Sequence, residues 1–520
     1  MNKKRKFVPE ISVQDAMEQA ARLVESMAFE EKVEMTGGVD YYFIRPLERL
    51  GIPRVLMSDA TMGINLRSEF MGVKYTNHVD KTTAFPATIC LAAGWNTDLS
   101  YEYAAAVAEQ CRAEGIGILL GPGLNLYRHS QCGRNFEYFG EDPYLISKMV
   151  ESYVAGVQET GVVATIKHFI ANNTDYFRRK SNSIVDDRTL HEIYLPGFAA
   201  GVEAGAMAVM TGYNLFNGEW CGESSYVIKT LLREELGFQW LVMTDWWSVE
   251  NGERLIKSGM DIEMPYTIAA KNIQELVDTG TVQVEEIDRM VTHIVATCLA
   301  MKLYERKPEP GKYMDRYGLH EKTALRCARE GVVLLKNRDG ILPLDADSGD
   351  TVLLTGKFID TVYKGGGAAI VEGYDNVSLR QACTNAFKER LLVSEDPSDE
   401  QIASAKTVLL SVGTEDSEGW DRPFDLPHGE EEEIRRITAL NPRCVVIVQS
   451  GGGIIMSAWI DAAAAVLYCW YPGQNGNTAI AEILTGAVNP SGKLPITIER
   501  DFKDSPGYGY IPDGEKLYTG

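Results

Sequence analysis

An aspartate flanked by two tryptophans is the first residue whose setting suggests chemistry. Asp245 lies at the end of the apolar run LVMTDWW and is followed directly by Trp246 and Trp247. Cleavage of a glycosidic bond requires a carboxylate, and the apolar faces of sugars stack on aromatic rings. A simpler interpretation is that Asp245 caps the next helix while both tryptophans lie in the core. The motif alone leaves both interpretations open.

A second segment carries cations that could act on such a carboxylate. In KHFIANNTDYFRRKSNSIVDDRTLHEIYLPGF, Lys167 and His168 end an apolar run and Arg178 lies in the loop that follows. Cations that converge on a carboxylate keep it ionised and nucleophilic at neutral pH, and they also donate hydrogen bonds to hydroxyl groups. A structural network of ion pairs would use the same residue types, so this segment needs its context.

Short apolar runs that alternate with amphipathic stretches must position these residues. One such stretch, 98–114, is expected to be a helix that opens at Asp98 or Ser100 and closes at Gly115. Apolar strands separated by helices are typical of a parallel sheet, and seven or eight such units predict a (β/α)8-like barrel. The apolar runs are 55–60, 87–95, 117–126, 164–173, 208–214, 240–247 and 261–265.

Polar residues follow the apolar bodies of several of these runs. Asp59, Lys167 with His168, Tyr213 and Asp245 all occupy such positions. Barrel enzymes keep their sites at the carboxyl ends of the strands, where residues from different strands converge. Together these residues therefore predict one site at that face.

The composition changes after residue 301, and a second alternation follows. Residues 302–320 are charged and contain proline and glycine, which is typical of a linker. A helix over 321–331 and the runs VVLLKN, TVLLTG, TVLLSVGT, CVVIVQSGGG and AAVLYCWYPG then predict a smaller open α/β sandwich. We expect a barrel over 1–301, a linker over 302–320 and the sandwich over 321–520. No element closes the chain after NPSGKLPITIERD, so we expect a C-terminal truncation or a separate missing piece.

Charge and composition narrow the classes of partner. The net charge of −22 argues against nucleic acid, because phosphates require a basic face. No stretch approaches about 18–20 uninterrupted apolar residues, so no membrane span is expected. The nine cysteines contain no CxxC pair and are typical of reduced thiols in a cytoplasmic protein. The oligomeric state stays open, including a homo-oligomer.

Neither a metal nor a nucleotide cofactor is expected. The seven histidines show no HExxH or similar ligand spacing, which speaks against a zinc site. The glycine runs at 365–367 and 451–453 form neither GxGxxG nor GxxxxGK[ST], so tight turns are the better interpretation.

Eight stretches of the chain together closely resemble glycoside hydrolase family 3, the β-glucosidase family. They occur in the order and spacing of that family across about residues 30–500. The resemblance implies a barrel-like domain followed by an α/β sandwich, in agreement with the alternation above. The stretches are MSDATMG, CGRNFEYFGEDPYL, KHFIANN…VDDRTLHEIYLPGF, VMTGYN, VMTDWW, SEGWDR, WYPGQ and NPSGKLP.

The resemblance also assigns roles to individual residues. It implies that Asp245 is the nucleophile and that Glu418 of EGWDR, in the second domain, is the general acid/base. The position of the acid/base varies in the family, and Glu415, Asp416 and Glu430 to Glu433 are nearby carboxylates. Tyr213 would orient the nucleophile, and Trp246 would form a platform under the sugar. The residues expected to bind the sugar hydroxyl groups are Asp59, Arg134, Lys167, His168 and Arg178.

The chain departs from the family pattern in two loops. The family often has a serine that can touch the sugar in the glycine-rich loop of the second domain, and here that loop is GGGAA (365–369). Many members have DGPHG where this chain has DATMG, which keeps Asp59 but alters the rim of the pocket. Longer members also continue into a fibronectin-like domain after NPSGKLP.

These observations predict a retaining exo-β-glycosidase that acts by double displacement on a small β-glycoside. Cations around Asp245 are expected to lower its pKa, and an apolar, negatively charged setting is expected to raise that of Glu418. Asp59 suits a sugar with free O4 and O6 hydroxyl groups, so a β-glucoside is favoured over a β-xyloside. The N-acetylglucosaminidase branch is disfavoured, because NNTDYFRRK lacks that branch's catalytic histidine. A catalytically dead sugar-binding relative is the alternative of a different class.

Overall fold

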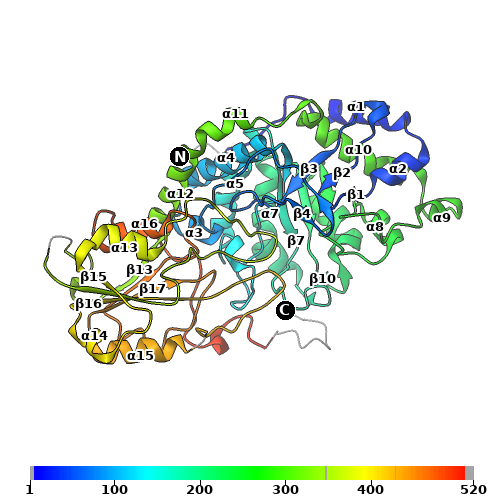
Figure 1. Ribbon diagram of the computed structural model, residues 1–520. Coiled ribbons are helices and arrows are strands. Elements are labelled where there is room, and N and C mark those ends of the chain that lie inside the picture. The colour runs from blue at the N-terminus through cyan, green and yellow to red at the C-terminus, as the bar shows by residue number, and fades with distance from the viewer. Residues whose placement is uncertain (1–4, 346–347, 428, 510–520) are drawn as a thin grey trace.

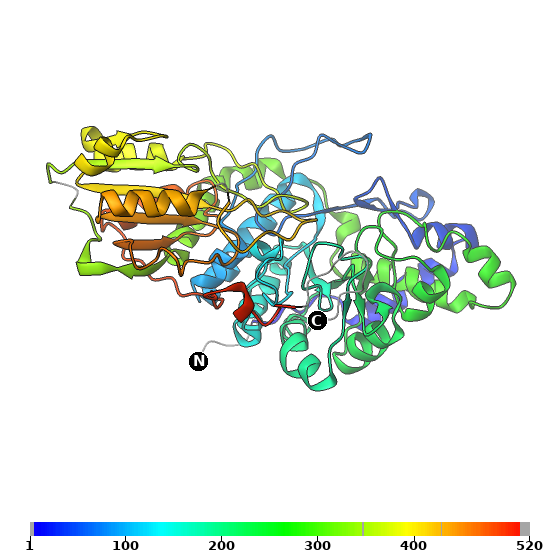
Figure 2. The same cartoon turned by 90° about the horizontal axis from the view of Figure 1, so that it is seen from below.

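A computed structural model describes residues 5–345, 348–427 and 429–509. Two lobes lie side by side, the N-terminal one coloured blue to green and the C-terminal one yellow to red (Figures 1 and 2). Residues 1–4 and 510–520, at the two ends of the chain, lie outside the described residues. The predicted C-terminal truncation falls at the second of these ends.

A closed ring of short strands forms the centre of the first lobe. The five strands from β3 to β12 are mutually parallel, whereas β1 and β2 pair in antiparallel fashion. Parallel bridges from Met243 to Ile262 and from Gly37 to Glu263 close the ring. The predicted barrel is therefore confirmed, with one strand, β2, running opposite to the others. In ring order, the strands are β1 (Gly38–Val39), β2 (Phe43–Ile44), β3 (Val55–Ser58), β6 (Ile116–Leu119), β7 (Val163–Phe169), β9 (Ala208–Thr211) and β12 (Leu241–Met243).

Helices surround this ring and begin and end at recognisable caps. Helix α4 (Thr97–Glu114) begins after Asn96, whose side-chain oxygen accepts from the N–H groups of Asp98 and Leu99. It ends at Gly115, which has the left-handed φ of 90° that glycine adopts without strain. The predicted end at Gly115 is confirmed, and the cap lies just before Asp98. The other helices of this lobe are α1 (Val13–Glu25), α2 (Phe29–Met35), α3 (Thr88–Ala93), α5 (Pro143–Glu159), α6 (Asp187–Thr189), α7 (Leu195–Glu203), α8 (Gly252–Ser258), α9 (Ile273–Asp278) and α10 (Val284–Ala300).

One predicted strand of the barrel is wrong. The apolar run 87–95 forms helix α3, and every side chain of that helix is buried. A short run that is apolar on all sides has neither helical nor strand periodicity, so sequence pattern cannot separate a buried helix from a buried strand. Two small sheets outside the ring supply the remaining strands of this lobe. One is the hairpin of β4 (Glu69–Phe70) and β5 (Val73–Lys74). The other contains β10 (Leu215–Phe216) between β8 (Asn182–Ser183), which is parallel to it, and β11 (Glu219–Trp220), which is antiparallel.

The second lobe is a six-stranded sheet between two layers of helices, which confirms the predicted α/β sandwich. Its first strand, β13, is antiparallel to β18, and the other strands are parallel. Two apolar cores lie on the two faces of the sheet, and Figure 1 shows α13 and α16 on one side and α14 and α15 on the other. The strands in sheet order are β13 (Val333–Asn337), β18 (Ala465–Tyr468), β17 (Cys444–Gln449), β16 (Thr407–Gly413), β14 (Val352–Gly356) and β15 (Leu391–Val393). The helices are α12 (Tyr317–Gly331), α13 (Leu379–Phe387), α14 (Asp399–Ser404), α15 (Glu430–Leu440) and α16 (Gly476–Leu484).

The segment predicted as a linker contains helical structure. Within 302–320 lie the 3-10 turn Leu303–Glu305, the short helix α11 (Pro310–Tyr313) and the first residues of α12. The division of the chain at 302–320 stays our proposal.

Candidate active site

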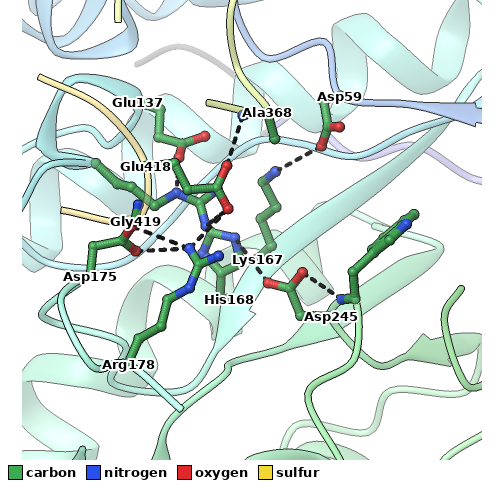
Figure 3. Close-up of polar contacts among 12 residues, drawn as sticks. Asp59, Glu137, Lys167, His168, Asp175, Arg178, Asp245, Ala368, Glu418 and Gly419 are labelled. Carbon is green, nitrogen blue, oxygen red and sulfur yellow. Dashed lines mark hydrogen bonds and ion pairs between the residues drawn. The ribbon is translucent and has the colours of Figure 1, made fainter. Parts of the chain in front are cut away.

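A cavity of about 340 Å³ lies where the two lobes meet. Loops at the carboxyl ends of the barrel strands line one side of it, and two loops of the second lobe line the other (Figure 3). The structure brings all nine predicted site residues to this cavity: Asp59, Arg134, Lys167, His168, Arg178, Tyr213, Asp245, Trp246 and Glu418. Of the alternative acids, neither Glu415 nor Asp416 lines it.

Asp59 forms a charged corner of the cavity directly after β3. Its Oδ2 accepts a hydrogen bond from Nη2 of Arg67 at 3.0 Å, and Nζ of Lys167 lies 3.7 Å from its Oδ1. The guanidinium of Arg67 in turn lies 4.3 Å from the centre of the Tyr42 ring. Two cations therefore hold a buried carboxylate in place, with donors and acceptors that could bind neighbouring hydroxyl groups.

Asp245 follows β12 and presents one oxygen to the cavity. Its Oδ1 accepts from the N–H of Trp246 at 2.8 Å. No described residue forms a hydrogen bond to its Oδ2, which lies 3.7 Å from Nε2 of His168. A buried polar atom without a partner is unusual and is typical of a functional site. The geometry leaves Oδ2 of Asp245 available to a ligand in the cavity.

His168 beside Asp245 is a neutral ring. Burial lowers its pKa well below the ordinary value, and the nearby Arg134 and Lys167 act in the same direction. Its Nδ1 lies 2.9 Å from Oδ1 of Asn125, whose Nδ2 donates to the carbonyl of His168. His168 therefore offers hydrogen bonding rather than a positive charge.

Glu418 reaches the barrel from the loop after β16 and contacts two arginines there. Its Oε1 lies 2.8 Å from Nη1 of Arg178 and 3.5 Å from Nη1 of Arg134. Its Oε2 accepts from the N–H of Ala368 at 2.8 Å. Figure 3 shows Glu418 between Arg178 and Ala368, on the same side of the cavity as Asp175 and Gly419. Glu418 is thus the point at which the second lobe meets the cations of the barrel.

The expected order of the two carboxyl pKa values is wrong. Burial raises the pKa of Asp245 to about 6, against the opposing effect of Arg178 and Arg134. Burial also acts to raise the pKa of Glu418, but Arg134 and Arg178 outweigh it and hold this pKa well below the ordinary value. The sequence showed that cations converge here, but it could not show that they contact Glu418 more closely than Asp245.

The two predicted aromatic residues both line the cavity. The ring of Tyr213, after β9, packs against the guanidinium of Arg178 at 3.9 Å. The indole of Trp246 donates from Nε1 to the carbonyl of Tyr41 at 3.1 Å, which fixes its orientation. A fixed indole beside a carboxylate is suited to stacking against a sugar ring.

Several residues that line the cavity were missed from the sequence. They include Arg67, Asn65, Tyr42 and Trp247, together with Gly367 and Ala368 of the second lobe. Arg67 lies in a loop without strand or helix periodicity, so its pairing with Asp59 had no signal in the sequence. Trp247 was noted beside Trp246 but was given no role.

The GGGAA loop contacts Glu418 through its main chain. Gly367 has a left-handed φ of 87°, and a Cβ there would lie 2.3 Å from Cβ of Glu418. Asn65 of the barrel donates to the carbonyl of Ala368 at 3.1 Å. Glycine is therefore required where this loop passes Glu418, and the barrel holds the loop in place.

Two further kinds of feature are absent from the described part of the chain. Within residues 5–345, 348–427 and 429–509, no group of three or more His, Cys, Asp or Glu side chains is arranged to hold a metal ion. No helix in those ranges is long and apolar enough to cross a membrane.

Similar proteins were found in three comparisons. Residues 17–297 match the glycosyl hydrolase family 3 N-terminal domain, and residues 332–519 match the C-terminal domain of the same family. The chain is 34% identical to the thermostable beta-glucosidase B of Acetivibrio thermocellus, over 94% of this chain and 67% of that protein. It is 30% identical to an exo-alpha-(1->6)-L-arabinopyranosidase of Bifidobacterium longum, over 96% of this chain and 70% of that protein.

Solved structures give the same result for the fold. Beta-glucosidase 3B of Thermotoga neapolitana in complex with glycerol superimposes with a TM-score of 0.87 at 28% identity, over 96% of this chain and 79% of that one. Since two family domains together match most of the chain, in the order in which the two lobes occur, this chain belongs to glycosyl hydrolase family 3.

Proposed function

We propose that this chain is a retaining exo-β-glycosidase that releases terminal glucose from β-glucosides, with Asp245 as nucleophile and Glu418 as general acid/base. The observation that carries the proposal is that these two carboxyl groups, one from each lobe, line a single cavity. A retaining glycosidase needs such a pair on either side of the scissile bond. Family membership and the similarity to the beta-glucosidase of Acetivibrio thermocellus support it.

In the proposed reaction Oδ2 of Asp245 attacks the anomeric carbon while protonated Glu418 gives its proton to the leaving oxygen. The bond from the anomeric carbon to the aglycone breaks as the bond to Asp245 forms, which leaves a covalent glycosyl-enzyme. Glu418, now ionised, then removes a proton from water, and the resulting nucleophile displaces Asp245. Two inversions at the anomeric carbon give net retention.

The remaining predicted residues would hold the sugar. Asp59, fixed by Arg67 and Lys167, would accept hydrogen bonds from the outer hydroxyl groups of the ring. Arg134, Lys167, His168 and Arg178 would bind the hydroxyl groups near the reacting carbon. Trp246 would stack beneath the ring, and Tyr213 would face the nucleophile.

The ion pair between Arg178 and Glu418 must be weakened by the substrate before Glu418 can act as general acid. Glu418 must carry a proton to act as general acid, and it cannot do so readily while it pairs with two arginines. Sugar hydroxyl groups that take hydrogen bonds from Arg134 and Arg178 would weaken this pairing. Substrate binding would thus raise the pKa of Glu418 at the moment when its proton is needed.

A panel of nitrophenyl glycosides tests the sugar specificity. We expect the highest kcat/KM for β-D-glucopyranoside and lower values for β-D-xylopyranoside and α-L-arabinopyranoside, which lack the C6 hydroxyl group. The arabinopyranoside belongs in the panel because a relative at 30% identity is named for that sugar. A preference for either sugar without C6 would overturn the glucosidase assignment and leave the glycosidase assignment intact.

The stereochemistry of the first product tests the mechanism itself. Proton NMR during early hydrolysis should show β-glucose before mutarotation. First formation of α-glucose would contradict double displacement. Absence of turnover of every aryl glycoside, with retained glucose binding, would instead favour the sugar-binding alternative.

The same proposal extends to partners and location. The substrate would be a small oligosaccharide or an aryl or alkyl β-glycoside. A reducing, cytoplasmic location is supported by the nine cysteines, all of which are buried free thiols.

A further inference from the structure

The loop that carries Glu418 is attached to the barrel at two points that directly follow that residue. At the first point, the N–H of Gly419 donates to Oδ2 of Asp175, which lies in the barrel loop after β7 (Figure 3). Further along, Oδ1 of Asp421 accepts from the N–H of Asp175 at 2.8 Å and from the N–H of Gly133 at 3.3 Å. The attachment is reciprocal, because the side chain of each aspartate binds main chain that belongs to the other lobe.

Asp175 contacts one of the arginines that pair with Glu418, and Asp421 binds the main chain beside the other. Nη1 of Arg178 lies 3.0 Å from Oδ1 of Asp175 and 2.8 Å from Oε1 of Glu418, so one guanidinium links the two carboxylates. Asp421 binds the N–H of Gly133, which immediately precedes Arg134. Asp175 therefore acts on Arg178 directly, and Asp421 acts on Arg134 through the main chain.

We propose that Asp175 and Asp421 are positioning residues that hold the Glu418 loop against the barrel and set the place of the proton-donating carboxyl group. This inference rests on the proposed role of Glu418. Neither aspartate lines the cavity, so each acts through Glu418 and its arginines rather than on the substrate.

Burial and charge indicate that Asp175 and Asp421 do more than hold the two lobes together. Asp175 is 2% exposed, and no described residue forms a hydrogen bond to Oδ2 of Asp421. Burial raises the pKa of Asp421 to about 7, and the neighbouring Asp175 adds to this. A buried carboxyl group beside a second, part-buried one is costly at a contact between the lobes. Their cost is understandable if they fix the arginines and the loop that present Glu418.

The test compares two substrates that differ in their need for acid assistance. Phenyl β-glucoside has a poor leaving group and depends on the proton from Glu418, whereas 2,4-dinitrophenyl β-glucoside does not. In Asp421→Ala we expect kcat/KM to fall about 10–100-fold for the phenyl glucoside and far less for the dinitrophenyl glucoside. Asp421→Asn keeps the acceptor oxygen and should recover most of the phenyl activity.

Glu141→Ala serves as the matched control. Oε1 of Glu141 accepts from Thr497 of the second lobe at 2.7 Å, so this variant loses a contact between the lobes away from Glu418. It should leave the ratio of the two substrates unchanged. If Asp421→Ala fails to fold, as judged by thermal unfolding, Asp175→Ala replaces it in the same comparison.

Three results would overturn the positioning role: an equal loss on both substrates, no loss in the folded variant, or an Asp421→Asn variant as impaired as Asp421→Ala. Failure of the proposed function would look different, because wild-type protein would then hydrolyse neither glucoside.

Discussion

Nη1 of Arg178 and Oε1 of Glu418 lie 2.8 Å apart, although one residue belongs to the barrel and the other to the sandwich lobe. This ion pair joins the two lobes at the cavity that Asp245 also lines. Arg134 and Arg178 hold the pKa of Glu418 well below its ordinary value. If Glu418 is the proton donor, as we propose, the substrate must separate a pair that the fold brings together.

Loss of the nucleophile should abolish turnover. We expect Asp245→Ala to lower kcat by about 10³-fold or more, because the variant lacks the carboxyl oxygen proposed to attack the anomeric carbon. The measurement is hydrolysis of 2,4-dinitrophenyl β-glucoside, whose good leaving group removes any dependence on Glu418. Activity within about tenfold of wild type would exclude Asp245 as nucleophile.

Loss of the acid/base should depend on the leaving group. In Glu418→Ala we expect a large fall of kcat/KM for phenyl β-glucoside, a small fall for the dinitrophenyl glucoside, and rescue by azide that yields β-glucosyl azide. Glu415→Ala, three residues away and outside the cavity, is the control and should behave as wild type. Azide that gives no product, or equal losses on both substrates, would remove Glu418 from this role.

The pH dependence follows from the coupling of the two carboxyl groups. In the proposed reactive form, Asp245 and Glu418 together carry one proton. The higher of their two pKa values, about 6, belongs to Asp245. As pH rises through about 6 the last proton leaves, so kcat/KM should fall there, whichever carboxyl group holds the proton at reaction.

Replacement of Arg178 tests which groups cause the fall of kcat/KM near pH 6. Arg178 lowers the pKa of both Asp245 and Glu418, so Arg178→Gln should raise both and move the falling limb of kcat/KM to higher pH. The measurement is a profile of kcat/KM from about pH 4 to pH 9. A limb that stays in place would show that these two carboxyl groups do not set it.

The corner formed by Asp59 should control sugar binding. Arg67→Met removes the 3.0 Å hydrogen bond that fixes Oδ2 of Asp59. We expect kcat/KM for nitrophenyl β-glucoside to fall about 10–100-fold, the value of one charge-assisted hydrogen bond. Arg54→Met, which removes an exposed arginine that packs on Phe43 outside the cavity, should have no such effect. Equal effects of the two variants would contradict the role of Arg67.

A buried cluster of ion pairs around Asp261, in the barrel lobe, should contribute to the free energy of unfolding. Asp261 contacts Arg233 at 2.6 Å and both Arg289 and His293 at 2.8 Å, and these cations lower its pKa to about 2 despite its burial. Because this pKa is lowered on folding, the stabilisation is present above the ordinary value of 3.8 and is lost as pH falls towards about 2. Asp261→Asn should lower the free energy of unfolding at neutral pH by about 3–5 kcal/mol, measured by urea denaturation.

Asp360→Asn is the control for that measurement. Asp360 pairs with Arg380 at the surface, where an ion pair contributes about 0–1 kcal/mol. Equal effects of the two substitutions would contradict the structural role of the Asp261 cluster.

The sequence allowed prediction of the residues at the carboxyl ends of barrel strands, because the apolar runs show where those strands end. Asp59, Lys167, His168 and Asp245 all line the cavity for this reason. Arg134 and Glu418 lie in irregular loops, and only the resemblance to a family pointed to them. Arg67 and the Asp175–Asp421 contact were missed, because contacts between loops leave no periodic pattern. The run 87–95 was misassigned because it is apolar on every side.

The structure of a trapped glycosyl-enzyme would test the account most directly. A crystal soaked with a 2-deoxy-2-fluoro-β-glucoside should show Oδ2 of Asp245 bonded to the anomeric carbon and Glu418 separated from Arg178, with the two carboxyl groups about 5–5.5 Å apart. A covalent sugar on another residue, or a Glu418 that still pairs with Arg178 away from the anomeric carbon, would contradict it.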